Sequence, residues 1–192
     1  LFINQNKNDF LVYNQDDPRV CEMVKSALAR RVGFSKSRAK ILPISPAEIK
    51  MPGRHNLENS LVAAQVAYRC GVTRETVARV LRNFAGVEHR LEFVATIDKV
   101  KFYNDSKATN PAASVAAIEA FAGQEIVLIL GGRDKGVDLK PLSSKIKKMV
   151  KEVVLFGEAA KKFEDALSGN GFRATHSVGF SFVSFCYRKP SA

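Results

Sequence analysis

Apolar residues in the first part of the chain recur with the spacings of a strand, a helix and a second strand. Residues 9–13 (DFLVY) are rich in β-forming side chains, and apolar residues within 19–30 recur every three to four positions, as in a helix. Asp17 and Pro18 stand where an N-cap and a first helical residue are expected, and 31–34 could form the next strand. This order predicts a βαβ fragment with a parallel sheet.

Two helices are predicted after a basic stretch that prolines interrupt. The first spans 57–70, with Asn56 as its most economical N-cap and Gly71 in the usual position after a C-terminus. Thr73 is expected to cap the second helix, which runs to about residue 84. Two consecutive helices joined by so short a turn predict a helical hairpin.

Strand and helix patterns alternate through the rest of the chain. A β-hairpin is predicted over 91–103, with Asp98 and Lys99 as its turn, and Pro111 is expected to open a helix. The apolar run 126–130 (IVLIL) is typical of a strand buried on both faces. A helix, a strand, a helix and a strand are then expected over 139–150, 153–156, 159–167 and 174–178. The alternation predicts a doubly wound, Rossmann-like α/β domain.

The two ends of the chain fit this pattern poorly. Four aromatic residues crowd 177–192 without helical spacing or loop chemistry: Phe180, Phe182, Phe185 and Tyr187. Their alternation could form a strand, but a foreign or frame-shifted ending is the favoured interpretation. Residues 1–3 (LFI) resemble the interior of a strand and include no initiator Met, so a cut within a longer protein is expected.

Composition narrows the class of protein. The 192 residues, of which 46% are hydrophobic, suffice for one full domain and part of another. No apolar run approaches the roughly 18 residues that span a bilayer. The three cysteines share no close spacing, which argues against a disulfide framework or a structural zinc site. A folded cytoplasmic protein is expected.

The net charge of +11 leaves several partners open. A basic surface can hold nucleic acid, or it can attract small polyanions such as nucleotides. The lysines between 135 and 162, many at helical spacing, favour a solvated helix face. No aromatic stacking pattern accompanies them, which weakens the case for nucleic acid.

Candidate chemistry lies in two loops at the predicted carboxyl ends of strands, where open parallel sheets bind ligands. In the first loop, 104–110 (NDSKATN), Lys107 could hold a carboxylate or phosphate while Asp105 takes ribose hydroxyls or orients a cation. An ordinary polar turn capped by Asn110 is the alternative.

The second loop, 131–136 (GGRDKG), has glycines that allow close backbone approach, and it adds Arg133 and Lys135. Because the two loops follow successive strands of one sheet, they are expected to converge on one crevice. The P-loop spacing GxxxxGK[ST] is absent from the chain, as are HExxH and GxGxxG, so spacing alone names no reaction.

Four segments, in this order and at these separations, resemble the Mur ligase family: 53–59 (GRHNLEN), 87–92 (VEHRLE), 104–111 (NDSKATNP) and 130–136 (LGGRDKG). The resemblance covers roughly residues 1–172, and DSKATNP looks like the D-glutamate-adding branch. It implies an ATP- and Mg²⁺-dependent enzyme of peptidoglycan synthesis. That enzyme joins D-glutamate to UDP-N-acetylmuramoyl-L-alanine through an acyl phosphate, by positioning and charge stabilisation.

The resemblance also implies residue roles on the nucleotide side. Asn56 and Asn59, an exposed amide pair one turn apart, would read the adenine edge. Arg90 and Asp105 would contact the ATP phosphate and ribose across the domain junction; a salt bridge between the domains is the alternative for Arg90.

On the amino-acid side, Lys107 and Thr109 would form part of the D-glutamate site, and Lys135 would supply a second cation for its carboxylates. Arg90 and Lys107 are the candidates for charge stabilisation during catalysis. No metal-ligating residue is assigned.

The departures from the family set the expected domains. The N-terminal domain, the P-loop, the magnesium carboxylate and the lysine that the family modifies to a carbamate have no counterpart. Residues 1–87 are therefore interpreted as a C-terminal remnant of the central ATP-binding domain, and 88–192 as a truncated Rossmann-like ligase domain with an atypical tail.

The chain alone is expected to be inactive and to bind ATP weakly. The intact protein is expected to be a monomer that acts on small molecules, without nucleic-acid or membrane partners. Two alternatives remain: a non-catalytic nucleotide-binding module, and a Mur-type ligase for another amino acid.

Overall fold

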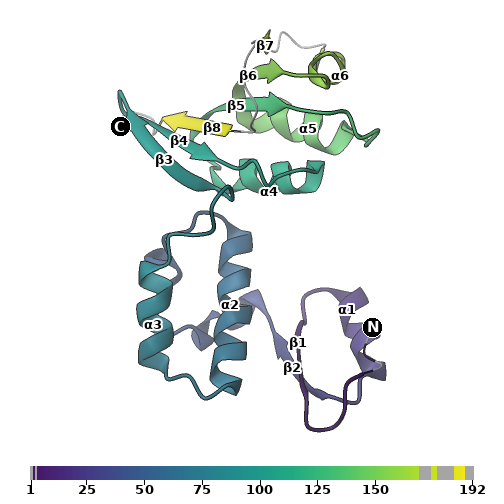
Figure 1. Cartoon of the computed structure of the whole chain (residues 1–192), viewed down its shortest axis with the longest axis vertical. Coiled ribbons are helices and arrows are strands. Elements are labelled where there is room, and N and C mark those ends of the chain that lie inside the picture. Colours follow the sequence, from purple (N-terminus) through teal and green to yellow (C-terminus); the bar gives the residue numbers. More distant parts are fainter. Residues whose placement is uncertain (1, 3, 169–173, 177–183, 189–192) are drawn as a thin grey trace. The chain divides into compact units, whose positions relative to one another are not determined.

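The computed structural model describes residues 2, 4–168, 174–176 and 184–188 (Figure 1). The chain divides into two compact units, Leu1–Phe84 and Ala85–Ala192. Each unit has its own cluster of buried apolar side chains.

The first unit opens with a βαβ arrangement. Strands β1 (Phe10–Asn14) and β2 (Arg30–Phe34) pair in parallel, as predicted, with α1 (Pro18–Met23) between them. Asp17 caps α1 by accepting the backbone N–H of Arg19 at 2.9 Å.

The predicted extent of this helix, 19–30, is wrong, because α1 ends at Met23 and a 3₁₀ turn, Val24–Ser26, follows. Parallel pairing places Arg30 opposite Phe10, at the start of both strands. The chain therefore leaves the helix early enough to return to the beginning of β1.

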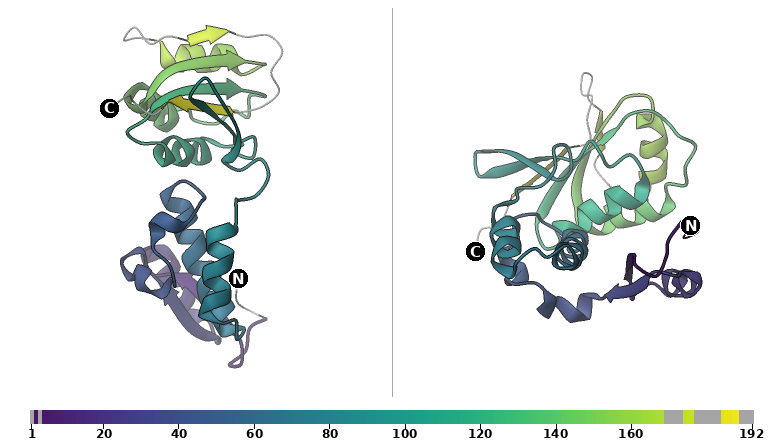
Figure 2. Two further views of the ribbon diagram at one scale, coloured as in Figure 1. Left: turned by 90° about the vertical axis from the view of Figure 1, so that its left-hand side faces the viewer. Right: turned by 60° about the horizontal axis from the view of Figure 1, so that its bottom comes forward.

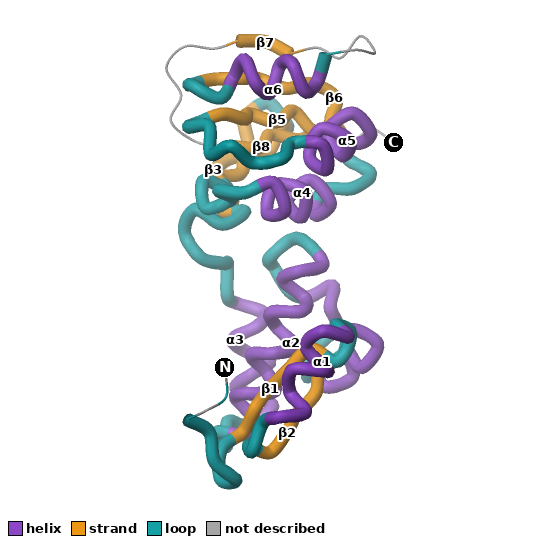
Figure 3. Tube along the Cα trace, turned by 90° about the vertical axis from the view of Figure 1, so that its right-hand side faces the viewer, coloured by secondary structure: helices purple, strands orange, loops and turns teal. Residues whose placement is uncertain are grey.

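Helices α2 (Arg54–Arg69) and α3 (Arg74–Asn83) form the predicted hairpin and lie side by side (Figures 1 and 3). Gly71 has a φ of 80° after α2, and the Thr73 side chain accepts the backbone N–H of Thr76 at 3.3 Å. The predicted C-terminus of α2 and the predicted N-cap of α3 are therefore both confirmed. Two further 3₁₀ segments, Lys36–Ile41 and Pro46–Glu48, precede α2. Leucine, valine and alanine side chains from both helices fill the core with Phe34: Leu61, Ala64, Val77, Ala78 and Leu81.

The prediction of Asn56 as the N-cap of α2 is wrong. The N-cap is Gly53, whose φ of 98° favours glycine. Asn56 lies inside the first turn, only 4% exposed, and its amide donates to the carbonyl of Pro52 at 2.6 Å. The Asn56 side chain thus donates to the carbonyl of Pro52, whereas an N-cap side chain would accept a backbone N–H of the first helical turn.

The second unit is a mixed sheet in the order β3-β4-β8-β5-β6-β7. Its strands are β3 (Glu92–Ile97), β4 (Val100–Asn104), β5 (Glu125–Gly131), β6 (Val150–Phe156), β7 (Ala174–His176) and β8 (Ser184–Arg188). The hairpin of β3 and β4 projects from one side of the sheet (Figure 2). Its turn residues Asp98 and Lys99 both have positive φ, 49° and 67°, as a type I′ turn requires, so the predicted hairpin is confirmed.

Three helices connect the strands: α4 (Pro111–Ala120), α5 (Lys140–Met149) and α6 (Ala160–Leu167). The chain advances in one direction across the sheet from β4 to β5, β6 and β7. Right-handed crossovers then place all three helices on one face, which is the near side in Figure 3. The predicted alternation of strand and helix is confirmed, and the core lies between this helical layer and β5 and β6.

Part of the tail forms a strand, which was the alternative to the favoured interpretation of a foreign or frame-shifted ending. Strand β8 lies between β4 and β5 and is antiparallel to both. Residues 177–183 and 189–192 lie outside the described residues, and the foreign origin of this ending stays a prediction.

Candidate functional site

The loops that follow β4 and β5 meet at one edge of the sheet. Strand β8 separates β4 from β5, so the two are not the neighbouring strands that the sequence suggested. Because β8 runs antiparallel to both, β4 and β5 still point in the same direction and end at the same edge. The side chain of Lys135 donates to the carbonyl oxygen of Thr109 at 3.4 Å, which joins the two loops directly.

A cavity of about 220 Å³ lies between these loops. Polar groups of both loops line it, including Ser106, Thr109, Asn110, Arg133 and Lys135. Apolar side chains from β5, β6, α5 and α6 line the remainder, among them Leu130, Leu142, Phe156 and Phe163. A cavity with an apolar lining and a few convergent polar groups is typical of small-molecule sites.

The cavity carries more positive than negative charge. Its carboxylate, Asp134, is bound by Lys162 at 2.6 Å and by the backbone N–H of Gly136 at 2.9 Å. These two bonds lower the pKa of Asp134, so it stays ionised and neutralises Lys162. Arg133 and Lys135, which have no carboxylate partner within the described residues, remain to attract an anion.

Lys107 is exposed beside the cavity. Its neighbours Ser106 and Ala108 line the cavity, whereas Lys107 does not. The backbone N–H of Thr109 donates to the carbonyl of Lys107 at 2.9 Å. The structure therefore brings Thr109 and Lys135 into contact and leaves Lys107 exposed on a tight turn next to them.

Asp105 lies in the interior of the second unit and is only 4% exposed. Its carboxylate accepts the backbone N–H of Leu91 at 3.1 Å. Burial raises its pKa to about 6, against the opposing effects of the Leu91 hydrogen bond and the Arg90 charge. Asp105 thus holds the start of β3 against the end of β4, and its contact with a ribose stays a prediction.

This burial predicts a specific pH dependence of stability. The folded protein holds the Asp105 proton more tightly than the unfolded chain does, so stability is favoured below about pH 4 and falls as pH rises through about 6. Asp105→Asn keeps an acceptor for Leu91 without the charge. The unfolding free energy of Asp105→Asn minus that of the parent should rise by about 1–2 kcal/mol from pH 4 to pH 7. Urea titration of both proteins at both pH values measures this change.

Asp105→Ala is the matched control. It leaves the buried Leu91 N–H without its acceptor, so it should be about 1–3 kcal/mol less stable than Asp105→Asn at both pH values. A constant difference between Asp105→Asn and the parent across this range would show that the carboxylate does not titrate as its burial indicates.

The nucleotide-side residues are arranged differently from the expectation. Asn56 and Asn59 contact each other, with the Asn59 amide donating to the Asn56 side-chain oxygen at 3.4 Å. Asn56 is buried, so the prediction of an exposed amide pair is wrong for this residue, and Asn59 alone is exposed. Arg90 is exposed, and its guanidinium has no ion pair within the part of the chain that the structure describes.

The described residues offer no ready magnesium site. No group of three or more His, Cys, Asp or Glu side chains among them is arranged to hold a metal ion. The described residues thus provide no complete set of protein ligands for Mg²⁺. In the same described part, every helix is too short or too polar to cross a membrane.

Several residues of the cavity were missed by reasoning from sequence. Lys162 lies 28 positions from Asp134. The sequence indicates Phe156 and Phe163 only as apolar positions of a strand and a helix, and not as residues of a cavity. The signal that could have pointed to Lys162 is its place in the first turn of α6, the helix that follows β6 and so begins near a third strand end at the same edge of the sheet.

Comparison with known proteins assigns this architecture. Residues 89–181 match the family described as Mur ligase, glutamate ligase domain. Over 186 residues, the chain is 40% identical to the UDP-N-acetylmuramoylalanine–D-glutamate ligase of Thermoanaerobacter sp. (strain X514), with 86% of this chain and 40% of that protein covered. The chain belongs to the Mur ligase family.

Other proteins with the same printed name are similar to this Mur ligase chain. The one from Geobacillus kaustophilus is 41% identical over 179 residues, covering 84% of this chain and 39% of that protein. The one from Clostridioides difficile (strain 630) is 36% identical over 196 residues, covering 93% and 43%. The Mur ligase chain thus spans about two fifths of the length of these relatives.

Solved structures support the Mur ligase fold. MurF from Acinetobacter baumannii superposes with a TM-score of 0.67 at 19% identity, over 88% of this chain and 42% of that chain. UDP-N-acetylmuramate-alanine ligase MurC from Thermotoga maritima gives 0.54 at 22% identity, over 66% and 30%. At these identities the likeness establishes the fold alone.

Proposed function

We propose that this Mur ligase chain binds D-glutamate in the cavity between its two strand-end loops. It would serve the ATP-dependent joining of that amino acid to UDP-N-acetylmuramoyl-L-alanine in peptidoglycan synthesis. The observation that carries the proposal is the contact between Lys135 and Thr109 at a cavity whose charge is positive. The names of the curated relatives support the same substrate.

The charge of the cavity favours a dicarboxylate. D-Glutamate carries two carboxylates, and the site offers Lys135 and Arg133 on one loop with Lys107 on the turn beside it. The one described carboxylate in the lining, Asp134, is occupied by Lys162. Two carboxylates can therefore each reach a cation without competition from the protein's own anion.

These residues would act by binding and orientation. Lys135 and Lys107 would hold the two carboxylates, and Thr109 would contribute its hydroxyl beside them. The amine of the bound amino acid would then face an acyl phosphate, attack its carbonyl carbon and release phosphate. Fixing the amine in place lowers the entropic part of that barrier. Arg90, Asp105 and Asn59 keep their proposed roles toward ATP, whereas the buried Asn56 would act only by holding the Asn59 amide.

The cavity lies within the second unit, so the full chain can be tested directly for amino-acid binding. Titration with D-glutamate, followed by amide NMR, should perturb Thr109, Gly132 and Lys135 in preference to the first unit. L-Alanine and D-alanyl-D-alanine, which carry one carboxylate each, should perturb them less at equal concentration. Equal responses to all three compounds would argue for another amino acid or for no site.

Catalysis can be tested in a longer protein. A fusion can place this chain after the part of the Thermoanaerobacter relative that it does not cover. We expect the fusion to release phosphate from ATP only when D-glutamate and UDP-N-acetylmuramoyl-L-alanine are both present. A folded fusion that binds ATP but ignores D-glutamate would contradict the proposed substrate.

A further inference from the structure

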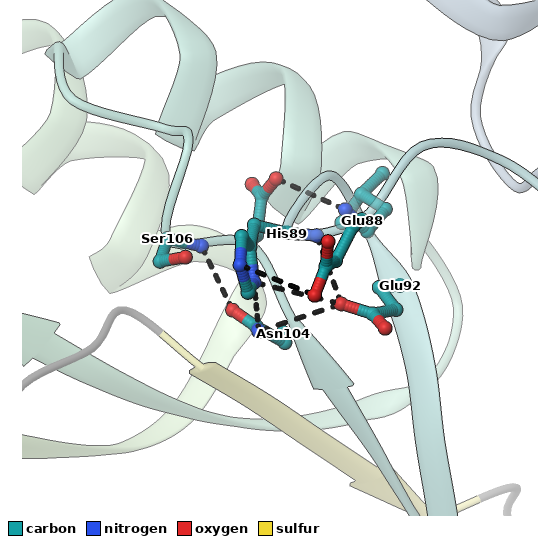
Figure 4. A network of polar contacts seen from close by, with 7 residues as sticks. Glu88, His89, Glu92, Asn104 and Ser106 are labelled. Atoms are coloured by element: carbon teal, nitrogen blue, oxygen red, sulfur yellow. Dashed lines mark hydrogen bonds and ion pairs between the residues drawn. The ribbon is translucent and has the colours of Figure 1, made fainter.

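The turn that carries Lys107 is hydrogen-bonded to the segment of the second unit that leads into β3 (Figure 4). The Asn104 amide lies 2.8 Å from Nδ1 of His89, and the backbone N–H of Lys107 donates to the His89 carbonyl at 3.0 Å. The backbone N–H of Leu91 donates to Asp105 at 3.1 Å. Three hydrogen bonds thus tie residues 89–91 to residues 104–107.

The contacts of Asn104 decide the tautomer of His89. The Asn104 side-chain oxygen accepts the backbone N–H of Ser106 at 3.1 Å, so its amide nitrogen is the atom that faces the imidazole. An amide nitrogen can only donate, and Nδ1 must therefore accept. The ring proton then lies on Nε2, which is 3.6 Å from the carboxylate of Glu88. Figure 4 shows the imidazole between Glu88, Glu92 and Asn104.

Glu92 holds the same segment from the other side. Its carboxylate accepts the backbone N–H of His89 at 2.8 Å and lies 3.5 Å from the Asn104 amide. It is also 3.7 Å from Nδ1 of His89. The imidazole is thus enclosed by two carboxylates and one amide, and only the amide bonds to Nδ1 in the neutral ring.

The backbone of this segment is strained where the bonds form. His89 has a φ of 64° and Leu91 a φ of 44°, in the left-handed region that side chains disfavour. Such a conformation is unfavourable for a residue with a Cβ atom and persists where its surroundings enforce it. In this segment the carbonyl of His89 accepts the N–H of Lys107, and the N–H of Leu91 donates to the Asp105 carboxylate.

We propose that His89 is a positioning residue, which fixes the turn 104–109 through its Nδ1 and its carbonyl oxygen. A continuous path runs from it to the cavity. His89 bonds to the N–H of Lys107, the carbonyl of Lys107 accepts the N–H of Thr109, and the carbonyl of Thr109 accepts Lys135. The consequence for D-glutamate rests on the proposed function, whereas the fixing of the turn does not.

Two substitutions at His89 distinguish the effect of its side chain from the effect of its strained backbone conformation. Asparagine tolerates positive φ and places its carbonyl oxygen near the position of Nδ1, so it keeps an acceptor for Asn104. Glycine accommodates the same φ without any acceptor. His89→Asn should therefore preserve the turn and His89→Gly should loosen it, although both fit the backbone.

The first measurement is made on the full chain and needs no ligand. Long-range ¹H–¹⁵N NMR of the three histidines should show His89 in the Nε2–H tautomer. Asn104→Asp keeps the bond to Ser106 but replaces the donor that faces Nδ1 with an acceptor, so the ring proton should move to Nδ1. An Nδ1–H tautomer in the parent protein would overturn the proposal.

The second measurement is amide hydrogen exchange at Lys107. We expect exchange to be about five- to tenfold faster in His89→Gly than in the parent, and nearly unchanged in His89→Asn. Equal exchange rates in all three proteins would also overturn the proposal, because the side chain would then hold nothing in place.

The third measurement links the turn to the substrate. D-Glutamate affinity should fall about five- to tenfold in His89→Gly and recover in His89→Asn. If His89→Gly loosens the turn and yet leaves the affinity of the parent unchanged, positioning toward the substrate is refuted. Absence of D-glutamate binding by the parent itself would instead refute the proposed function, while the tautomer and exchange results would still decide the role of His89.

Discussion

Replacing Gly131 by alanine is expected to lower the unfolding free energy of the second unit by about 3 kcal/mol or more. Gly131 ends β5 and pairs with Phe156 of β6. A Cβ atom there would overlap the carbonyl oxygen of Phe156, which is backbone and belongs to the neighbouring strand. Relief requires β5 and β6 to separate at the edge that forms the cavity.

Gly123→Ala is the matched control for this substitution. Gly123 has a φ of 80°, but a Cβ atom there would meet nothing within 4 Å. It should lose only about 1 kcal/mol, from backbone conformation alone. Urea unfolding followed by circular dichroism at neutral pH compares the two. Equal losses would mean that β6 yields easily and that the close approach of the strands is not rigid.

Replacing Lys135 by alanine is expected to weaken D-glutamate binding by the chain about 10- to 100-fold, if the proposed function holds. A hydrogen bond to a charged group contributes about 1.5–3 kcal/mol, and Lys135 is a cation that lines the cavity. The substitution also removes the bond to Thr109, so the two loops lose their direct link. Isothermal titration of the parent and the variant gives the ratio of dissociation constants.

Lys148→Ala controls for general charge. Lys148 is an exposed lysine on α5 that is not among the residues of the cavity, and its loss changes the net charge by the same amount. Its effect on affinity should be less than about twofold, because Lys148 does not line the cavity and physiological salt screens exposed charges. Equal losses in the two variants would show that the chain attracts D-glutamate by overall charge and not through this cavity.

Short-range signals in the sequence located most elements. The caps at Asp17 and Thr73, the glycine after α2 and the turn at Asp98-Lys99 were all predicted correctly. Each depends on hydrogen bonds or backbone preferences over at most a few residues, so the local sequence contains the information. The same holds for the two loops, because apolar runs mark the strands that precede them.

Errors arose where a distant or neighbouring group competed with a local preference. The Pro52 carbonyl bonds Asn56, and Gly53 takes the cap position. Pairing with β1 shortened the first helix, since β2 begins opposite Phe10. In both places the local pattern allowed the predicted structure, and a contact outside that pattern decided against it.

The sequence by itself determined the alternating α/β architecture, the positions of both strand-end loops and the resemblance to the Mur ligases. Only the tertiary structure decided that β8 lies between β4 and β5, that Asp105 is buried against Leu91, that Lys162 neutralises Asp134, and that His89 holds Asn104. These partners lie 14 to 28 positions apart or in different strands of one sheet. Such pairings depend on how the whole domain packs, and no spacing along the chain encodes them.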